Sequence, residues 1–298
     1  MTPGTPRGLS HGRAVATMVA VTLMWSIAGV VTRHLEAARS FEVTFWRSAF
    51  TLLALALMLP LLRGRAALVA SVRAGGATLW LSGVCWSVMF TAFMLAMTLT
   101  PVANVLVTMA ISPLLTALIA RVFLRHRLAP RTWLAIAVAG AGIAWMYASE
   151  LRTADPQHLI GTVVALGVPV AAAINWVVIQ HARSRPERDL LPAVLIGAAL
   201  SALVTLPFAW PFAASTHDLA LLALLGVVQL AIPCLLSVAI ARHLSAPEMS
   251  LLALLEVLFG VAWAWLGAGE APALHVLGGG ALVLGALAAN EAVALRRR

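Results

Sequence analysis

Long uninterrupted apolar runs are the feature that most constrains this 298-residue chain. Ten of them have about 20 residues each, the helix length that crosses roughly 30 Å of hydrocarbon. Backbone within a bilayer must satisfy its own hydrogen bonds, so we expect these runs to be helices. A transmembrane barrel would instead show strands of about ten residues with alternating polarity. The predicted spans are residues 14–33, 42–62, 77–98, 101–123, 131–149, 158–181, 190–211, 218–241, 247–267 and 273–294.

The composition excludes an ordinary soluble domain. Charged residues make up only 10% of the chain and hydrophobic residues 62%, whereas about 25% of a typical soluble domain is charged. The net charge of +9 does not indicate nucleic acid, because the arginines lie in small clusters between apolar runs. Cys85 and Cys234 lie within such runs, which is not the spacing of a disulfide framework or a metal site. We predict an all-α membrane protein surrounded by lipid, without a metal, a cofactor or a nucleic-acid partner.

The arginines predict which side of the membrane each loop faces. With a cytoplasmic N-terminus, sixteen of the twenty basic residues fall at cytoplasmic ends of spans, as the positive-inside rule requires. The first run, behind Arg7 and Arg13, is longer than the apolar region of a signal peptide and lacks its cleavage pattern, so we interpret it as a span. An even number of spans then places both termini in the cytoplasm. The expected location is the bacterial inner (plasma) membrane.

The two halves of the chain, residues 1–150 and 151–298, are similar at an offset of 144 positions. This offset places Pro113 on Val257 and His126 on Glu270, and each half ends in a glycine-rich helix. Five spans per half is an odd number, so the second half must be inverted relative to the first. Inverted repeats are typical of secondary transporters, whose substrate site lies between the repeats near the membrane midplane. The sequence therefore predicts ten transmembrane helices as two inverted five-helix repeats.

Short motifs also occur at characteristic places along the chain. They are Trp25-Ser26, Arg47, the run from Ala96 to Pro113, the run from Phe123 to Leu128, Trp133, Gly140-Ala141-Gly142, Ala246-Pro247, Gly269-Glu270 and the stretch from Gly278 to Gly285. With these motifs the chain resembles the drug/metabolite transporter superfamily, EamA type. The resemblance implies an inverted five-plus-five helix arrangement, cytoplasmic termini and movement of small metabolites, and it favours the amino-acid exporters of that superfamily. One departure is His126, where the first repeat usually has an acid; the acid is retained at Glu270, which favours a helix-capping role for Glu270.

Two charged residues within the spans are candidates for substrate contact, because a charge at the bilayer centre costs about 2.5–3.5 kcal/mol. Glu256 lies about ten residues into the ninth span. It either faces a cavity, as a contact for a substrate amine or a proton, or is a protonated group bonded to a neighbouring helix. Arg47 in the second span either snorkels to the surface, pairs with Glu42, or holds a substrate carboxylate. The sequence leaves these alternatives open.

Uncharged residues complete the set of candidate cavity-lining residues and hinges. Four of them are polar: Ser26, Thr108, Asn175 and Gln229. For each, the alternative to lining the cavity is an interhelical hydrogen bond, worth about 0.6 kcal/mol. Five are aromatic or sulfur-containing: Trp25, Trp86, Met89, Phe90 and Trp176. They lie too deep in their spans to sit at the membrane–water interface, so they belong either to the ordinary core or to an apolar pocket. Three prolines interrupt spans, as hinges or as static kinks: Pro113, Pro169 and Pro233.

These features favour a secondary transporter or facilitator that exports neutral or aromatic amino acids, or related small metabolites, by alternating access. The alternative is a proton-coupled exporter of cationic drugs, in which Glu256 neutralises the cation. We do not expect an enzyme, because no pair of catalytic groups lies at membrane depth and no phosphate-binding glycine-lysine motif indicates ATP. The expected partners are lipid and a small-molecule substrate, and the expected state is a monomer or a weak homodimer.

Overall fold

The computed structural model describes residues 10–38, 40–100, 105, 108–124, 129–146, 156–182, 189–268 and 274–296. These residues form helices and their connections, without a strand among them. The helices are α1 (His11–Trp25), α2 (Ala28–Thr32), α3 (Ser40–Arg63), α4 (Arg65–Leu99), α6 (Ser112–Phe123), α7 (Pro130–Met146), α8 (Pro156–Ala182), α9 (Leu191–Ala209), α10 (Thr216–Leu224), the π-helix η2 (Leu225–Ala231), α11 (Ile232–Ile240), α12 (Ala246–Ala253), α13 (Leu255–Ala268) and α14 (Leu274–Arg296).

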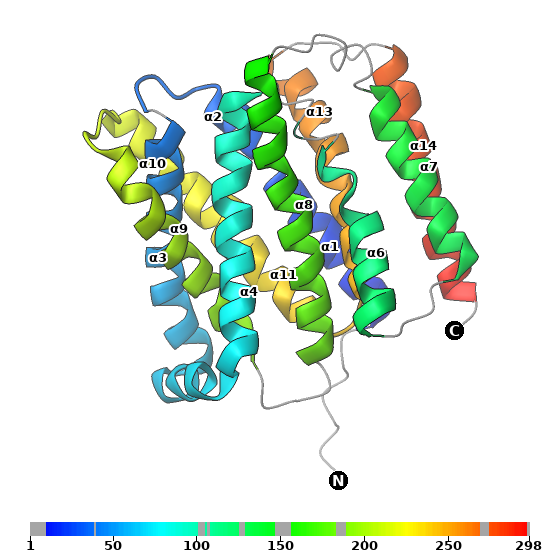
Figure 1. Ribbon diagram of the computed structural model, residues 1–298, viewed down its shortest axis with the longest axis horizontal. Coiled ribbons are helices and arrows are strands. Elements are labelled where there is room, and N and C mark those ends of the chain that lie inside the picture. The colour runs from blue at the N-terminus through cyan, green and yellow to red at the C-terminus, as the bar shows by residue number, and fades with distance from the viewer. Residues whose placement is uncertain are drawn as a thin grey trace.

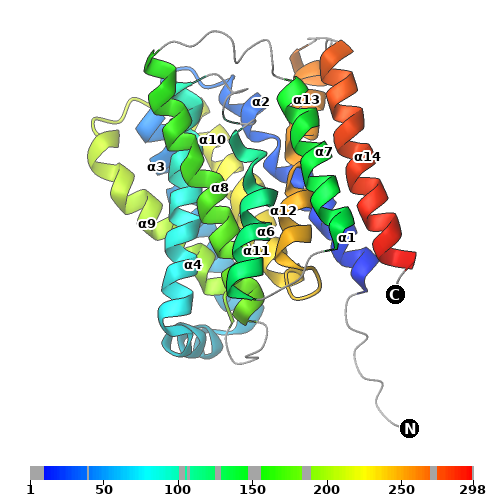
Figure 2. The ribbon, with the colours of Figure 1, turned by 45° about the vertical axis from the view of Figure 1, so that its right-hand side comes forward.

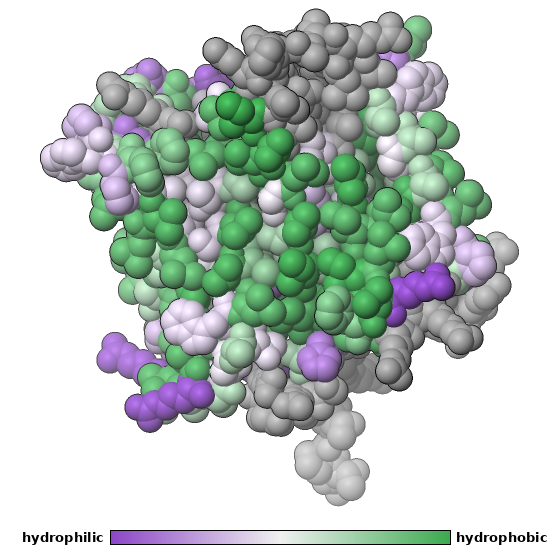
Figure 3. All heavy atoms as spheres, in the orientation of Figure 1, coloured by the Kyte–Doolittle hydropathy of each residue, from purple (hydrophilic) through white to green (hydrophobic). Residues whose placement is uncertain are grey.

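The described helices make ten passes through one bundle, which confirms the predicted number (Figure 1). Three passes are composite: α1 with α2, α10 with η2 and α11, and α12 with α13. Six passes are long and apolar enough to cross a membrane by length and composition, and shorter apolar helices supply others. α1 begins and α14 ends at the same end of the bundle (Figures 1 and 2). Figure 3 shows a broad band of hydrophobic side chains around the middle of the visible face, as contact with lipid requires.

The helix contacts follow the predicted inverted repeat. α3 packs on α9, α6 on α12 and α7 on α14, so each helix meets its counterpart in the other half. The contact of α4 with α8 is matched by that of α11 with α1, and the contact of α4 with α9 is matched by that of η2 with α3. Two five-helix halves related by a pseudo-two-fold axis produce this pairing.

One glycine in each repeat allows a close approach of two of these helices. A Cβ atom on Gly83 of α4 would lie 2.6 Å from Cγ2 of Ile196 on α9. A Cβ atom on Gly226 of η2 would lie 2.6 Å from Cβ of Phe50 and 2.8 Å from the carbonyl oxygen of Arg47, both on α3. Any larger residue at either position would push the two helices apart.

Several predicted spans are interrupted where continuous helices were expected. The span at 14–33 breaks between Trp25 and Ala28, the span at 218–241 contains the π-helix η2, and the span at 247–267 breaks at Leu254. In the span at 101–123, α6 begins only at Ser112, after a turn at residues 110–111. The turns at 110 and 254 are related by the offset of 144 positions, so the two repeats break at corresponding places. Hydropathy does not reveal such breaks, because broken and continuous segments are equally apolar.

The connection between the second and third spans also differs from the expected loop. α4 begins at Arg65 and bends at Gly76, whose φ of 52° lies in the region that favours glycine. Residues 65–75 thus form a separate helical segment, the elbow helix, which lies across the end of the bundle rather than along it (Figure 1). Its alanines, leucine and arginines are good helix formers, which explains why this polar-flanked stretch is not a loop.

Two buried carboxylates tie the halves together at the opposite end of the bundle, and we call them the carboxylate clamp. Asp218 accepts hydrogen bonds from the backbone N–H groups of residues 36, 37 and 38 at 2.8, 3.0 and 3.0 Å. Glu42 accepts from the backbone N–H groups of Ala213 and Ala214 at 2.9 and 2.8 Å. Each half therefore supplies an acid that holds a loop of the other half.

Candidate functional site

A cavity lies in the middle of the bundle and takes its wall from both repeats. It offers about 110 Å³ to the centres of water-sized molecules, and about 830 Å³ of space when its open mouth is included. Eight of the predicted lining residues are part of its wall: Trp25, Arg47, Trp86, Met89, Phe90, Trp176, Gln229 and Glu256. Pro169, predicted as a hinge, also lines it.

Three other predicted lining residues are not part of the cavity wall. Ser26 accepts a hydrogen bond from Nε1 of Trp263 at 3.0 Å. Asn175 is buried, and its side-chain oxygen accepts from the hydroxyl of Ser82 at 2.6 Å. For these two residues, the interhelical hydrogen bond is the role that the contacts support. Thr108 is buried as well.

The sequence reasoning missed several residues of the wall. Phe93 lies one turn from Phe90 and Met89 on α4, so helical spacing would have indicated it. Ser112 and Ser250 also line the cavity, and their hydroxyl oxygens are 3.0 Å apart where α6 meets α12. Ser112 is the counterpart of Glu256 at the offset of 144, so the repeat itself pointed to it.

Arg47 is 1% exposed and lies against α4, where its Nη2 donates to the carbonyl oxygen of Phe90 at 2.7 Å. It does not snorkel to the surface. Nor is it held by Glu42, because that carboxylate accepts from Ala213 and Ala214. The Nε of Arg47 is buried and has no hydrogen-bond partner among the described residues. The side chain therefore keeps one donor free beside the cavity.

Gln229 joins two interrupted passes at the cavity. It lies in η2, and its Nε2 donates to the carbonyl oxygen of Trp25, the last residue of α1, at 3.2 Å. The last carbonyl groups of a helix lack partners within it, so this bond stabilises the end of α1. π-Helical segments occur frequently at functional sites. The Oε1 of Gln229 is buried without a partner in the described part of the chain.

Glu256 lies in the first turn of α13, directly after the break at Leu254. A carboxylate is stabilised there by the positive end of the helix dipole. Both Glu256 and Arg47 line the cavity, yet no ion pair joins these two described side chains. The cavity thus holds one basic and one acidic side chain without an ion pair between them.

The rest of the wall is mainly aromatic and apolar. The ring centroids of Trp86 and Phe90 are 5.6 Å apart, and those of Trp86 and Trp176 are 6.0 Å apart in an edge-to-face arrangement. The Nε1 of Trp86 is buried without a hydrogen-bond partner among the described residues. Trp86 therefore contributes both a flat apolar surface and a free donor.

The predicted hinge prolines occupy two kinds of position. Pro169 lies inside α8, where it removes a helical hydrogen bond. Pro113 and Pro233 lie in the first turns of α6 and α11. α6 follows the turn at residues 110–111, where proline is tolerated, whereas α11 continues directly from η2, so Pro233 lies within a continuous helical pass. His126 and Glu270 lie outside the described residues, so the predicted capping role of Glu270 is not visible.

Comparisons with known proteins agree with this architecture. The family model described as the EamA-like transporter family matches residues 12–148 and again residues 159–290. The pseudopaline exporter CntI, from two strains of Pseudomonas aeruginosa, is 26% identical to this chain over 282 residues, which covers 93% of this chain and 94% of the exporter. A solved crystal structure superposes with a TM-score of 0.75 over 94% of this chain and 97% of its own. Its sequence identity is 19%, so that likeness shows the fold alone.

Proposed function

Because the chain belongs to the EamA-like transporter family, we propose that it exports neutral or aromatic amino acids, or related small zwitterionic metabolites, across the bacterial inner membrane by alternating access. The observation that carries this proposal is the pair of separated charges, Arg47 and Glu256, in an otherwise apolar and aromatic cavity. A relative of similar length is named as an exporter of a small metabolite, which supports the direction of transport.

Buried polar atoms without partners, on residues that line the cavity, match the two ends of a zwitterion. Nε of Arg47 and Nε1 of Trp86 are donors without partners among the described residues, and they suit a carboxylate. Oε1 of Gln229 is an acceptor that also lacks a partner among the described residues, and together with the carboxylate of Glu256 it suits an ammonium group. A buried polar atom without a partner costs about 1–3 kcal/mol. A ligand that satisfies both sets recovers this free energy, and an analogue that lacks one end does not.

The apolar wall suits the side chain of the same substrate. Trp86, Phe90 and Trp176 present ring faces and edges, and Met89 and Met109 offer adaptable thioether surface. Such a wall accepts branched or aromatic side chains and gives little discrimination between them, since one methylene is worth only about 1–3 kcal/mol. We therefore expect several neutral amino acids to be carried.

Alternating access needs the two repeats, residues 1–150 and 151–298, to move against each other around the cavity. The breaks at Leu254 and at residues 110–111 flank the crossing of α6 and α12, where Ser112 and Ser250 meet. Together with Pro169, these breaks are the flexible points that we propose as hinges. The arginine distribution supports cytoplasmic termini, so the carboxylate clamp would close the periplasmic end.

The second candidate, a proton-coupled exporter of cationic drugs, is favoured by Glu256 and by the apolar wall of the cavity. The buried Arg47 in the same cavity opposes it, because a like charge in a low-dielectric site repels a cationic ligand. The amino-acid proposal uses both charges, and the drug proposal uses one.

Liposomes that contain the purified protein distinguish the two candidates. Labelled phenylalanine is compared with phenethylamine, which lacks the carboxylate, with 3-phenylpropionate, which lacks the amine, and with ethidium, each with and without a pH gradient. We expect uptake of phenylalanine alone and its loss in Arg47→Gln, with Arg121→Gln, an exposed arginine of α6, as the matched control. Ethidium uptake that depends on the pH gradient and vanishes in Glu256→Gln would replace this proposal with the drug exporter.

A further inference from the structure

A second pocket lies at the end of the bundle where α1 begins, outside the central cavity. We call it the basal pocket. It encloses about 620 Å³ of space, including its mouth, between the end of α3, the end of α8, the start of α9 and the end of α11. Its charged lining is Arg63, Asp189 and Arg242, and its apolar lining includes Ile179, Leu191 and Val238.

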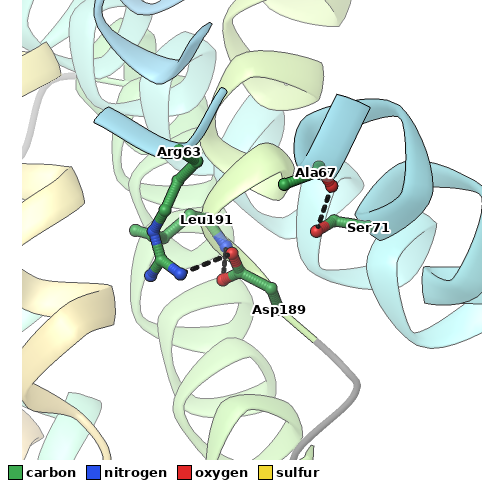
Figure 4. Close-up of polar contacts among 5 residues, drawn as sticks. All are labelled: Arg63, Ala67, Ser71, Asp189 and Leu191. Carbon is green, nitrogen blue, oxygen red and sulfur yellow. Dashed lines mark hydrogen bonds and ion pairs between the residues drawn. The ribbon is translucent and has the colours of Figure 1, made fainter. Parts of the chain in front are cut away.

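The charges of the basal pocket do not balance. Nη1 of Arg63 lies 3.6 Å from Oδ2 of Asp189, and these side chains are 51% and 18% exposed. Asp189 is already used at α9, because its Oδ1 accepts from the backbone N–H of Leu191 at 3.1 Å (Figure 4). Arg242 has no partner within the described residues. The charged lining thus has two guanidinium groups and one carboxylate, which contacts Arg63 and the first backbone N–H of α9 but not Arg242, and this leaves the lining with a net positive charge.

The surface beside the basal pocket is apolar and faces lipid. Leu61 and Leu62, directly before Arg63, are 85% and 66% exposed. The elbow helix follows, with Arg65 and Arg73 on either side of Val69, which is 48% exposed. A helix with arginines and apolar residues on its outer face lies at the level of lipid headgroups. The basal pocket therefore opens at the depth where headgroup and acyl chain meet.

We propose that the basal pocket binds the phosphate headgroup of an anionic phospholipid. Arg63 and Arg242 hold the phosphate, since guanidinium groups match its geometry with paired donors. The acyl chains lie along Leu61, Leu62 and the apolar face of the elbow helix. A free anion would contact the arginines alone, whereas a lipid held by its phosphate also places its acyl chains on this exposed apolar surface. Basic pockets between membrane helices are suited to anionic headgroups.

Lipid titration of the purified full-length protein tests this proposal without any transport measurement. Binding of phosphatidylglycerol is measured by native mass spectrometry against phosphatidylcholine with the same acyl chains, and thermal unfolding is followed in parallel. We expect phosphatidylglycerol to bind and to raise the Tm. The double variant Arg63→Gln/Arg242→Gln should bind it roughly 30-fold more weakly, at the usual contribution of an arginine near an anionic surface.

Three variants separate binding from folding. Arg121→Gln, at the end of α6 and outside the basal pocket, should bind phosphatidylglycerol like the wild type. The double variant Arg63→Lys/Arg242→Lys should retain most of the affinity. Asp189→Asn keeps a capping oxygen for α9 but removes the competing charge, so it should bind phosphatidylglycerol more tightly. Equal affinity of wild type and the Gln double variant would overturn the proposal, and so would an equal rise in Tm with inorganic phosphate alone.

Discussion

The guanidinium group of Arg47 is held by a neighbouring helix, and its Nε has no partner among the described residues. Its place within a span was evident from the sequence. Its bond to the carbonyl oxygen of Phe90 was not, because that bond depends on how closely α3 approaches α4. The same holds for Gln229, whose polarity was visible but whose bond to Trp25 depends on the end of α1. Residue type thus identified candidate side chains, and helix packing decided their partners.

The free donor of Trp86 gives the first prediction. Trp86→Phe keeps an aromatic ring beside Phe90 and Trp176 but removes the Nε1–H group. A hydrogen bond to a charged group is worth about 1.5–3 kcal/mol, so we expect the KM for phenylalanine to rise at least about tenfold. Transport kinetics in liposomes measure this change. Trp80→Phe, at a tryptophan of α4 that is 53% exposed, is the control. An unchanged KM in Trp86→Phe would remove Trp86 from the proposed carboxylate site.

The carboxylate clamp gives a prediction about stability. Glu42 is 1% exposed and accepts from two backbone N–H groups of the other repeat. Glu42→Gln replaces charge-assisted hydrogen bonds with weaker ones and leaves an amide donor to be satisfied, so we expect a loss of about 1–3 kcal/mol of stability. Thermal unfolding in detergent measures it. Glu36→Gln, at an exposed glutamate of the neighbouring loop, should leave the Tm unchanged. A Tm of Glu42→Gln equal to those of Glu36→Gln and the wild type would show that the clamp contributes nothing to stability.

At the scale of helices, the number and approximate position of the passes followed from the apolar runs, whereas their interruptions did not. η2, the break at Leu254 and the bend at Gly76 occur in stretches whose hydropathy matches that of the intact helices. What distinguishes them is contact between helices, such as Gly226 against α3. The repeat offset contained part of this information, since the breaks at 110 and 254 correspond.

The approach of η2 to α3 is testable by adding one methyl group. Gly226→Ala places a Cβ atom 2.6 Å from Cβ of Phe50 and 2.8 Å from the carbonyl oxygen of Arg47. We expect a loss of about 1–3 kcal/mol from overpacking and reduced transport, because the backbone of Arg47 must shift. Gly260→Ala in α13, where the added atom meets nothing within 4 Å, is the matched control and should be neutral or slightly stabilising. A wild-type Tm for Gly226→Ala would contradict the close packing of η2 on α3.

At the scale of the whole molecule, two independent features of the sequence predict the same arrangement. The arginine bias required an even number of passes, and the internal similarity required five in each half. Both are consequences of the bilayer, which fixes helix length and sorts positive charge between its sides. The cavity was less predictable, because its wall combines residues from nine separate helical segments, and only the deepest aromatic and charged residues signalled it.

The predicted sidedness of the bundle is open to direct labelling. In a Cys85→Ala/Cys234→Ala background, single cysteines are introduced by Ser10→Cys, Arg296→Cys and Ala213→Cys. A membrane-impermeant maleimide added to right-side-out vesicles should label Ala213→Cys alone, and the other two should react only after the membrane is permeabilised. Labelling of the 10 and 296 positions from opposite sides would require an odd number of passes and would exclude the inverted arrangement.

The carboxylate clamp also governs how this end of the protein can diverge. In the opposite half, Glu42 and Asp218 accept hydrogen bonds from main-chain N–H groups, so the side chains at positions 36–38, 213 and 214 have little influence on these bonds, with proline the exception. Substitutions can therefore accumulate in these two loops while the hydrogen bonds beneath them stay intact. The sequence of this surface can in this way diverge without loss of the contacts that join the two halves.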